Sequence, residues 1–289
     1  TTVQNVIWEL SRTLYIKPVL ELDPVKLDGV VVKRATAYNA KYIFDNKLGK
    51  GSKVKIIRSG GVIPKVLEIL TKSKEMIVPD VPYKWTDTKV DIILDQSADS
   101  PETKQAQRQY NIKRIHFFFN TLGVQSLGEK TVENIVNLFF KDRSPDMLDF
   151  IRLTAKDLLP LGPKASVTIS NNITRAVKSA TIVELMVASQ MFGRGIGMRK
   201  LEPILKLFPD FWSRYDGALA LIDHKRRDTL DVMIEDLEKV EGLSTVSSKL
   251  VRDGYLKFYE FFLELRPYLS PETVKRGPRP LSVSDLMWA

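Results

Sequence analysis

The sequence predicts an α+β protein in two parts, a small β-barrel followed by an all-helical region. Three observations support this division. Short segments rich in β-branched residues, separated by Pro, Gly and Asp, fill the chain up to about residue 70. From residue 112 to about residue 265, apolar residues recur three and four positions apart, which is the spacing of amphipathic helices. Four similar glycine-containing turns in the helical region indicate an internal repeat.

The N-terminal segments have the length and composition of β-strands. We expect strands near 6–10, 18–22, 29–32 and 52–57, with one short helix near 39–44. Several short strands around a single helix predict a small Greek-key barrel such as the OB-fold. We therefore assign residues 1–78 to an OB-fold domain.

The remaining chain divides into a connector, a helical domain and a tail. The connector, 79–111, is interrupted by prolines, and a strand pair is expected at 83–85 and 90–94. Within the helical domain, 112–265, helices are expected near 132–140, 201–208 and 228–239. The last stretch, 266–289, combines four prolines with basic residues and predicts an extended basic tail.

The composition favours a polyanionic partner. Lys and Arg number 44 against 35 Asp and Glu, which gives a formal charge of +9 and a pI near 9.5. Nucleic acid is the commonest partner of such a protein, although a basic surface also serves solubility alone. The chain has no cysteine, which excludes disulfides and thiolate metal sites. It also has no apolar run of membrane-spanning length and no secretory start, so we expect a cytoplasmic protein.

Four turns in the helical region share one design. Turns 1 to 4 span 123–130, 159–164, 192–200 and 240–244, and each places an apolar residue beside small residues ahead of an amphipathic helix. Small residues let the chain turn tightly between two helices, while the apolar residue anchors the turn. The amides that begin the second helix are then unpaired, and the positive end of the helix dipole lies behind them. Together they form a cradle for phosphate, which binds the DNA backbone without reading bases.

The predicted cradles contain glycines and polar or basic residues. The glycines at comparable intervals are Gly128, Gly162, Gly197 and Gly242. The polar and basic residues that follow are Lys130, Lys164, Arg199 and Lys200 in turns 1 to 3, and Ser244 and Ser247 in turn 4. A cation opposes the dipole at the start of a helix but suits a nearby phosphate. Glycines also end helices for purely structural reasons, but the repeated layout favours phosphate binding.

This repeat resembles the tandem helix-hairpin-helix domain of the NAD-dependent DNA ligases. In that family a glycine is usual where Ser126 stands in turn 1 and where Pro160 stands in turn 2. Turn 3 keeps Gly195 and Gly197. The resemblance therefore implies that turn 3 holds phosphate better than the first two turns.

Three motifs near the N-terminus are similar to the OB-fold domain of the same family. They lie within residues 10–19, 24–39 and 51–65, in the family's order and at close to its spacing. This chain departs from the pattern at Ser11 and Leu14, where glycines are usual, and at Gly61, where an acidic residue is usual. The resemblance covers nearly the whole chain up to about residue 265.

The resemblance implies that polar and basic residues of the barrel and the turns approach the DNA backbone or a nick. The alternative for the barrel is that its Arg and Lys side chains are solvated or brace loops. The predicted DNA-binding residues are Arg12, Thr13, Arg34, Thr36, Asn39, Arg58, Lys65, Gly128, Lys130, Gly162, Lys164, Gly195, Gly197, Arg199, Lys200, Gly242, Ser244 and Ser247.

One short match points to catalysis. Residues 26–29 fit Lys-x-Asp-Gly, the adenylated-lysine motif of nucleotidyltransferases, which would make Lys26 a nucleophile. Such a lysine must be desolvated or flanked by cations, and it needs a nucleotide pocket larger than the 25 residues before it provide. Because the same residues fit an OB-fold strand, we predict no catalytic residue in this chain.

The family's four-cysteine zinc module is also missing. With no cysteine and only His116 and His224, the chain cannot form a good tetrahedral zinc site, so we predict no bound metal. Residues 106–108 and 116–117 nevertheless resemble the sequence that follows the module in relatives. We interpret the connector as a zinc finger rebuilt without metal, around Tyr83 and Trp85, with His116 as a core or hinge residue.

The resemblance implies a DNA-binding subunit or portion of an NAD-dependent DNA ligase, which encircles nicked duplex DNA and positions it for sealing. A partner adenylation-domain chain would bind NAD and Mg²⁺ and carry the catalytic lysine, so this chain alone would be inactive. The start at Thr1 suits a ligase encoded as two polypeptides, although a truncated or proteolytic fragment would begin in the same way. Residues 277–282 resemble the approach to a terminal BRCT domain. The alternative function is a non-enzymatic, sequence-independent DNA-binding or repair scaffold.

Overall fold

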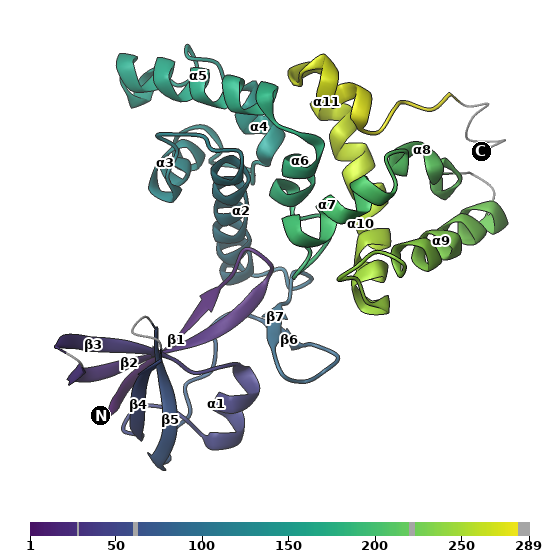
Figure 1. Ribbon diagram of the computed structural model, residues 1–289. Helices are drawn as coiled ribbons and strands as arrows, with labels where there is room; N and C mark the ends of the chain where they lie inside the picture. Colours follow the sequence, from purple (N-terminus) through teal and green to yellow (C-terminus); the bar gives the residue numbers. More distant parts are fainter. Residues whose placement is uncertain (28, 60–62, 220–222, 283–289) are drawn as a thin grey trace. The chain divides into compact units, whose positions relative to one another are not determined.

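The computed structural model describes residues 1–27, 29–59, 63–219 and 223–282. The chain divides into two compact units, Thr1–Asn111 and Ile112–Ala289 (Figure 1). Asp28 of the Lys-x-Asp-Gly match and Gly61 of the third barrel motif lie outside the described residues.

Before α2 (Pro101–Thr121) begins, the first unit contains seven strands and one short helix among its described residues. They are β1 (Val3–Leu10), β2 (Tyr15–Leu27), β3 (Val30–Thr36), α1 (Ala40–Asn46), β4 (Lys53–Ser59), β5 (Ile63–Thr71), β6 (Tyr83–Trp85) and β7 (Ile92–Leu94). Strand β2 pairs with β1 and β3, β3 pairs in parallel with β5, and β5 pairs with β4. A bridge between Thr2 and Lys53 joins the β1 end to β4 and closes the barrel. This closed order, with a helix between the third and fourth strands, is the predicted OB-fold.

Alternation along the strands builds the barrel core. Leu20 and Leu22 of β2, Val54 of β4 and Val66 of β5 are buried with Val3, because every second side chain of a strand points to the same side of the sheet. Helix α1 adds Ile43 to this core. Its position agrees with the predicted short helix, since Asn39 accepts a hydrogen bond from the Tyr42 amide and begins the helix.

The connector forms the predicted strand pair, β6 and β7, and β7 also pairs with β2. Aromatic packing supports this pair. The ring centroid of Phe44 lies 5.1 Å from that of Trp85 and 6.4 Å from that of Tyr83. Ile92 and Leu94 of β7 are buried in the same cluster, so apolar contacts hold the connector against α1 and β2.

The second unit is helical. Helix α2 (Pro101–Thr121) contains the division point, and the following elements are α3 (Glu129–Phe139), α4 (Met147–Arg152), η1 (Leu159–Leu161), α5 (Pro163–Ser179), α6 (Ile182–Ser189), α7 (Met198–Leu207), α8 (Phe211–Arg214), η2 (Asp216–Leu219), α9 (Asp223–Leu237), α10 (Thr245–Leu265), η3 (Arg266–Tyr268) and α11 (Pro271–Arg276). Helix α2 begins well before the predicted start at residue 112. Ser100 accepts a hydrogen bond from the Thr103 amide at 3.1 Å and Pro101 fills the first helical position, so the start is fixed by capping rather than by apolar periodicity.

An aromatic cluster forms the centre of the helical core. The ring of Trp212 stacks on Tyr255 at 4.9 Å and on Phe258 at 5.2 Å, and the Tyr255 hydroxyl donates to the Trp212 carbonyl at 2.8 Å. Burial raises the pKa of Tyr255 above the usual range for tyrosine. Gly254 makes the close approach of α10 possible, because a Cβ there would lie 2.6 Å from Cδ1 of Phe192.

Residues 266–276 are not the extended tail that the prolines predict. They form η3 and α11, and the buried Thr273 hydroxyl donates to the Ala180 carbonyl at 2.7 Å. Pro271 follows the capping residue Ser270, so it begins a helix rather than preventing one. Gly277 then passes against the ring of Phe262, where a Cβ has no room.

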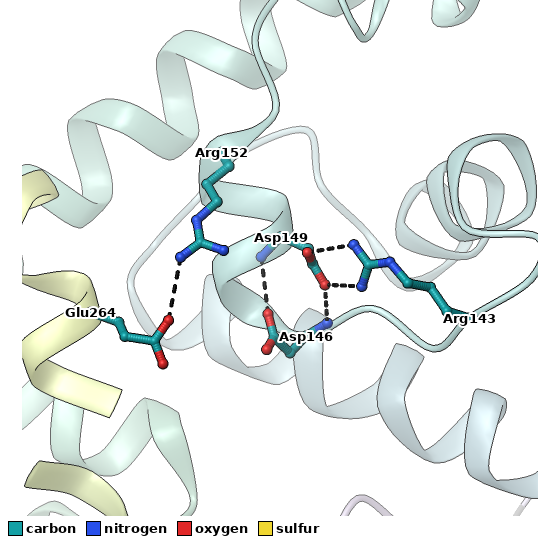
Figure 2. A network of polar contacts seen from close by, with 5 residues as sticks. All are labelled: Arg143, Asp146, Asp149, Arg152 and Glu264. Atoms are coloured by element: carbon teal, nitrogen blue, oxygen red, sulfur yellow. Dashed lines mark hydrogen bonds and ion pairs between the residues drawn. The ribbon is translucent and has the colours of Figure 1, made fainter. Parts of the chain in front are cut away.

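A polar network ties α4 to its surroundings (Figure 2). The Arg143 guanidinium donates two hydrogen bonds of 2.6 Å to Asp149, and these bonds hold the pKa of Asp149 below its usual range. Asp146 and Asp149 form a capping box at the start of α4, and Arg152 at its end contacts Glu264 of α10 at 3.3 Å. Because Arg143 is engaged by Asp149, its charge ties the segment between α3 and α4 to the start of α4.

Candidate nucleic-acid interface

Turns 1, 3 and 4 have the same backbone design. Each contains a residue with positive φ, at +65° for Ser126, +82° for Gly195 and +84° for Gly242. An apolar residue follows and packs into the core, and the next residue is the extended N-cap of the second helix. Ser126 therefore has a backbone conformation that favours glycine, at the position where the resemblance implies one. Glycine adopts positive φ at little cost, whereas serine is strained there.

This correspondence of backbone conformations corrects the predicted register of turn 4. Gly242 corresponds to Ser126 and Gly195, and Ser244 corresponds to the N-cap glycines Gly128 and Gly197. The sequence pattern placed Gly242 with the N-cap glycines because spacing alone cannot distinguish the two small residues of a turn. Backbone conformation distinguishes them, since only one of the two has positive φ.

The N-cap residues determine which helices have first-turn amides without a side-chain capping bond. Gly128 and Gly197 make no side-chain capping bond, so no N-cap side chain occupies the first amides of α3 and α7. In turn 4, the Ser244 hydroxyl accepts from the Ser247 amide and the Ser247 hydroxyl accepts from the Ser244 amide at 2.7 Å. Ser244 and Ser247 thus occupy each other's amides at the start of α10, a capping box that α3 and α7 lack.

Turn 2 departs from the common design. Its residues 159–161 form the 3-10 helix η1, and Gly162 has φ 102° and ψ 148°. Proline fixes φ near −65°, so Pro160 cannot take the positive φ found in the other turns. Pro163 occupies the first position of α5 and has no N–H to offer. Turn 2 therefore presents fewer amides than turns 1 and 3, while Lys164 remains exposed beside it.

The charges around the turns also differ. In turn 1, the Lys130 ammonium lies 2.8 Å from the Glu133 carboxylate, which partly neutralises it. In turn 3, neither Arg199 nor Lys200 forms an ion pair with another residue of the described ranges. Arg194 stands at the tip of turn 3 and was not among the predicted contacts, although its place inside the motif could have indicated it. Turn 3 is accordingly the most basic of the four.

Turn 4 lacks this charge. The position of Lys130 and Arg199 is occupied by Val246, whose side chain is 71% exposed, and Glu241 stands where turn 3 has Arg194. An exposed apolar residue and an acid suit a phosphate poorly. The predicted contacts of turn 4 are therefore the least favourable of the set.

The barrel brings three predicted residues to one outer face. Arg34 and Thr36 are exposed and alternate with buried Ala35 on β3, and Thr36 pairs with Lys65 of β5. Arg34 lies 3.4 Å from Glu21 on the neighbouring strand, so it also braces the sheet. The side-chain oxygen of Asn39 is used as the N-cap of α1, beside this face.

Other predicted barrel residues lie elsewhere. Because side chains alternate along β4, Arg58 lies on the same side of the strand as the buried Val54 and Ile56, and not on the side of Lys65. Arg12 and Thr13 occupy the turn that leads into β2 at Tyr15. Glu21, which pairs with Arg34, lies six residues further along β2, and at roughly 3.3 Å per residue this is a distance of about 20 Å. Leu14 in that turn has φ +67°, a conformation that glycine adopts at little cost, and it stands where the resemblance implies a glycine.

No catalytic or metal centre emerges from the described residues. Lys26 is exposed on β2 opposite Val31, without the burial that a nucleophilic lysine needs. His116 of α2 has Nδ1 3.9 Å from the Glu129 carboxylate, and the side chain of His224 lies outside the described part. Within the described ranges, no three His, Asp or Glu side chains gather in a way that could hold a metal ion.

The fold and the turns define the class of the protein, which is an OB-fold barrel joined to a unit of helical hairpins. Residues 1–76 match the family model of the NAD-dependent DNA ligase OB-fold domain. The chain is 29% identical over 279 residues to a DNA ligase of Acanthamoeba polyphaga mimivirus, covering 93% of this chain and 41% of the relative. It is 34% identical over 215 residues to a putative DNA ligase of Invertebrate iridescent virus 3, covering 71% and 26%. It is 28% identical over 264 residues to a DNA ligase of Desulfatibacillum aliphaticivorans, covering 88% and 37%.

These comparisons confirm the predicted relationship. The barrel is an OB-fold domain of the NAD-dependent DNA ligase type, and most of the chain is related to part of the DNA ligases. The chain spans between about a quarter and two-fifths of the length of these relatives. Among the described helices, none combines the length and apolar character that crossing a membrane requires.

Proposed function

We propose that this chain is the DNA-holding part of an NAD-dependent DNA ligase, which encircles nicked duplex DNA and positions it for sealing. The observation that carries the proposal is the repeated turn of the helical unit, in which uncapped helix starts and basic side chains occur together in turns 1 and 3. Unpaired amides and the helix dipole bind phosphate regardless of base sequence. The relationship to DNA ligases supports DNA as the source of that phosphate.

The proposed contacts are not equal. Turn 3, with Gly195, Gly197, Arg199 and Lys200, is the main phosphate site, and turn 1 with Gly128 and Lys130 is the second. Turn 2 contributes through Lys164 beside Gly162. In turn 4, we propose that Ser244 and Ser247 stabilise α10 instead of binding DNA, because each already satisfies the other.

The barrel contributes a second set of contacts. Arg34, Thr36 and Lys65 form its proposed DNA-facing surface, with Asn39 beside it. Arg12 and Thr13 contact the backbone separately, from the turn between β1 and β2, and Arg58 contacts it from the end of β4. In this proposal residues 1–78 are the barrel domain, 79–111 a metal-free connector and 112–265 the helix-hairpin-helix domain, followed by 266–289.

The chemistry of sealing is proposed to come from an adenylation domain outside these residues, carried by a partner chain in a heterodimer. NAD and Mg²⁺ would be bound there, since the residues described in this chain contain no cluster of metal ligands and Lys26 is exposed on β2. The role of this chain is positional. Holding both sides of a nick in register converts sealing into a reaction between groups already in place.

A complementation assay tests the proposal. The chain is incubated with NAD, Mg²⁺ and a labelled nicked duplex, alone and together with an adenylation domain of a related ligase. We expect sealing only with both components, and we expect the turn 3 variant Arg199→Ala to reduce it. Sealing by this chain alone would contradict the assignment of the chemistry to a partner. Binding without sealing in either condition would favour a DNA-binding scaffold.

A further inference from the structure

Tyr38, between β3 and α1, has an unusual conformation for a large side chain. Its φ is +59°, in the left-handed region that glycine tolerates and an aromatic residue rarely adopts. Its side chain is nevertheless 55% exposed, so core packing does not explain the strain. Non-glycine residues strained in this way cluster at functional sites and ligand clamps.

Two interactions fix the direction of the ring. The Tyr38 hydroxyl donates to the Val66 carbonyl of β5 at 2.8 Å. The ring also meets Tyr42 edge to face, with centroids 4.9 Å apart and an interplanar angle of 62°. Tyr42 is itself placed by the Asn39 cap, because its amide donates to the Asn39 side chain at 2.9 Å. The ring of Tyr38 is thus held at both ends while much of its surface stays open.

The surroundings of Tyr38 are those of a nucleic-acid contact. Thr36, two residues earlier, pairs with Lys65, and the carbonyl that accepts from Tyr38 belongs to the next residue, Val66. The ring therefore lies beside the barrel face proposed to hold backbone phosphates. Aromatic rings next to basic side chains on OB-folds are suited to stacking on nucleosides, because every nucleoside offers a flat apolar face.

We propose that Tyr38 packs against a nucleoside of the bound DNA strand whose phosphates contact Thr36 and Lys65. This rests on the proposed function of the barrel face. The nucleoside face is that of a base or that of a deoxyribose. A base at a nick can leave the stack at lower cost than a base in an intact duplex, whereas the deoxyribose face is equally open in both.

The test compares Tyr38→Gly, Tyr38→Phe and Leu70→Ala with the wild-type chain. Glycine removes the ring but relieves the left-handed strain, so Tyr38→Gly should keep a melting temperature close to that of the wild type. Its affinity for nicked duplex should fall about five- to a hundredfold. The slope of affinity against salt should stay unchanged, because no phosphate contact is lost. Phenylalanine keeps the ring and should keep most of the affinity, and Leu70→Ala, which removes another exposed apolar side chain of the barrel, should bind like the wild type.

The outcomes separate the two proposals. If the wild-type chain fails to bind nicked DNA in a salt-dependent way, the proposed function fails. If the wild type binds and Tyr38→Gly binds equally well, or loses affinity only in proportion to a lowered melting temperature, the stacking role of Tyr38 is overturned. A larger loss on nicked than on intact duplex identifies a base as the partner, and equal losses identify the deoxyribose.

Discussion

Substituting Gly254 by alanine tests the packing that places turn 3. Gly254 lies in the middle of α10, and a Cβ there would be 2.6 Å from Cδ1 of Phe192 and 2.8 Å from both the Met191 carbonyl oxygen and Cα of Phe192. Met191 directly precedes turn 3 and Phe192 is its first residue. The glycine therefore lets α10 approach the segment that carries the proposed main phosphate site.

The magnitude follows from these distances. In an unobstructed helix interior, alanine stabilises by about 1 kcal/mol relative to glycine. Overpacking costs typically about 1–3 kcal/mol, and the upper end applies because two of the three obstructing atoms are backbone atoms that cannot rotate away. We expect a net loss of about 2 kcal/mol in the free energy of unfolding of the helical unit. For a unit of this size, that loss lowers the melting temperature by about 4–8 °C.

Thermal unfolding followed by far-UV circular dichroism measures the effect, since the described helices lie mainly in the second unit. The matched control is Lys249→Ala, an exposed position of the same helix, which should change stability by no more than about 0.5 kcal/mol. Weaker binding of nicked DNA by Gly254→Ala is also expected. A Gly254→Ala variant as stable as the wild type would refute the close approach of α10 to residues 191 and 192.

Three further predictions concern other parts of the helical unit. Asp236→Ala removes the acceptor of side-chain bonds from three residues and should lower the free energy of unfolding by about 2 kcal/mol at neutral pH. The bond from Lys239 holds the pKa of Asp236 below its usual value, so the difference should be largest above about pH 4, near the ordinary pKa of aspartate, and should shrink as the pH falls through the lowered pKa. Urea titrations in which the difference does not shrink as the pH falls would contradict it. Arg199→Ala should reduce the slope of log affinity against log salt by about 0.9. Lys130→Ala should reduce the slope by less, because Glu133 already engages the Lys130 ammonium. Equal slopes for the two variants would contradict the ranking of the turns. Ser244→Ala should cost about 1 kcal/mol of stability, measured by chemical unfolding, and leave the affinity for nicked DNA at its wild-type value.

The barrel and the helices that follow the four turns could be predicted because their signals are local. The strand pair of β6 and β7 and the short helix α1 lie where the sequence pattern placed them. Signals that depend on capping were missed. The start of α2 at Pro101 is polar and carries no apolar periodicity, and α11 follows a Ser-Pro cap inside a proline-rich stretch that resembles a tail.

The candidate interface was predictable as a set of residues but not as a ranking. Ser126 at φ +65° has a conformation that favours glycine, which agrees with the prediction that turn 1 departs there from the family's pattern. The order in which the turns are expected to bind phosphate depends on side-chain contacts that the spacing of residues in the sequence does not reveal. The mutual capping of Ser244 and Ser247 and the ion pair between Lys130 and Glu133 decide which groups remain open to a phosphate. Tyr38 was overlooked because its strain is a property of the backbone.

The salt dependence of binding to nicked duplex DNA tests the central claim most directly. Affinity is measured for the wild-type chain on two nicked duplexes of unrelated sequence, from about 50 to 200 mM salt. If the turns and the barrel face together neutralise six or more phosphates, affinity should fall by about a thousandfold or more over this range, equally for both sequences. Affinity that ignores ionic strength, or that differs strongly between the two sequences, would contradict the account of this chain as a holder of the DNA backbone.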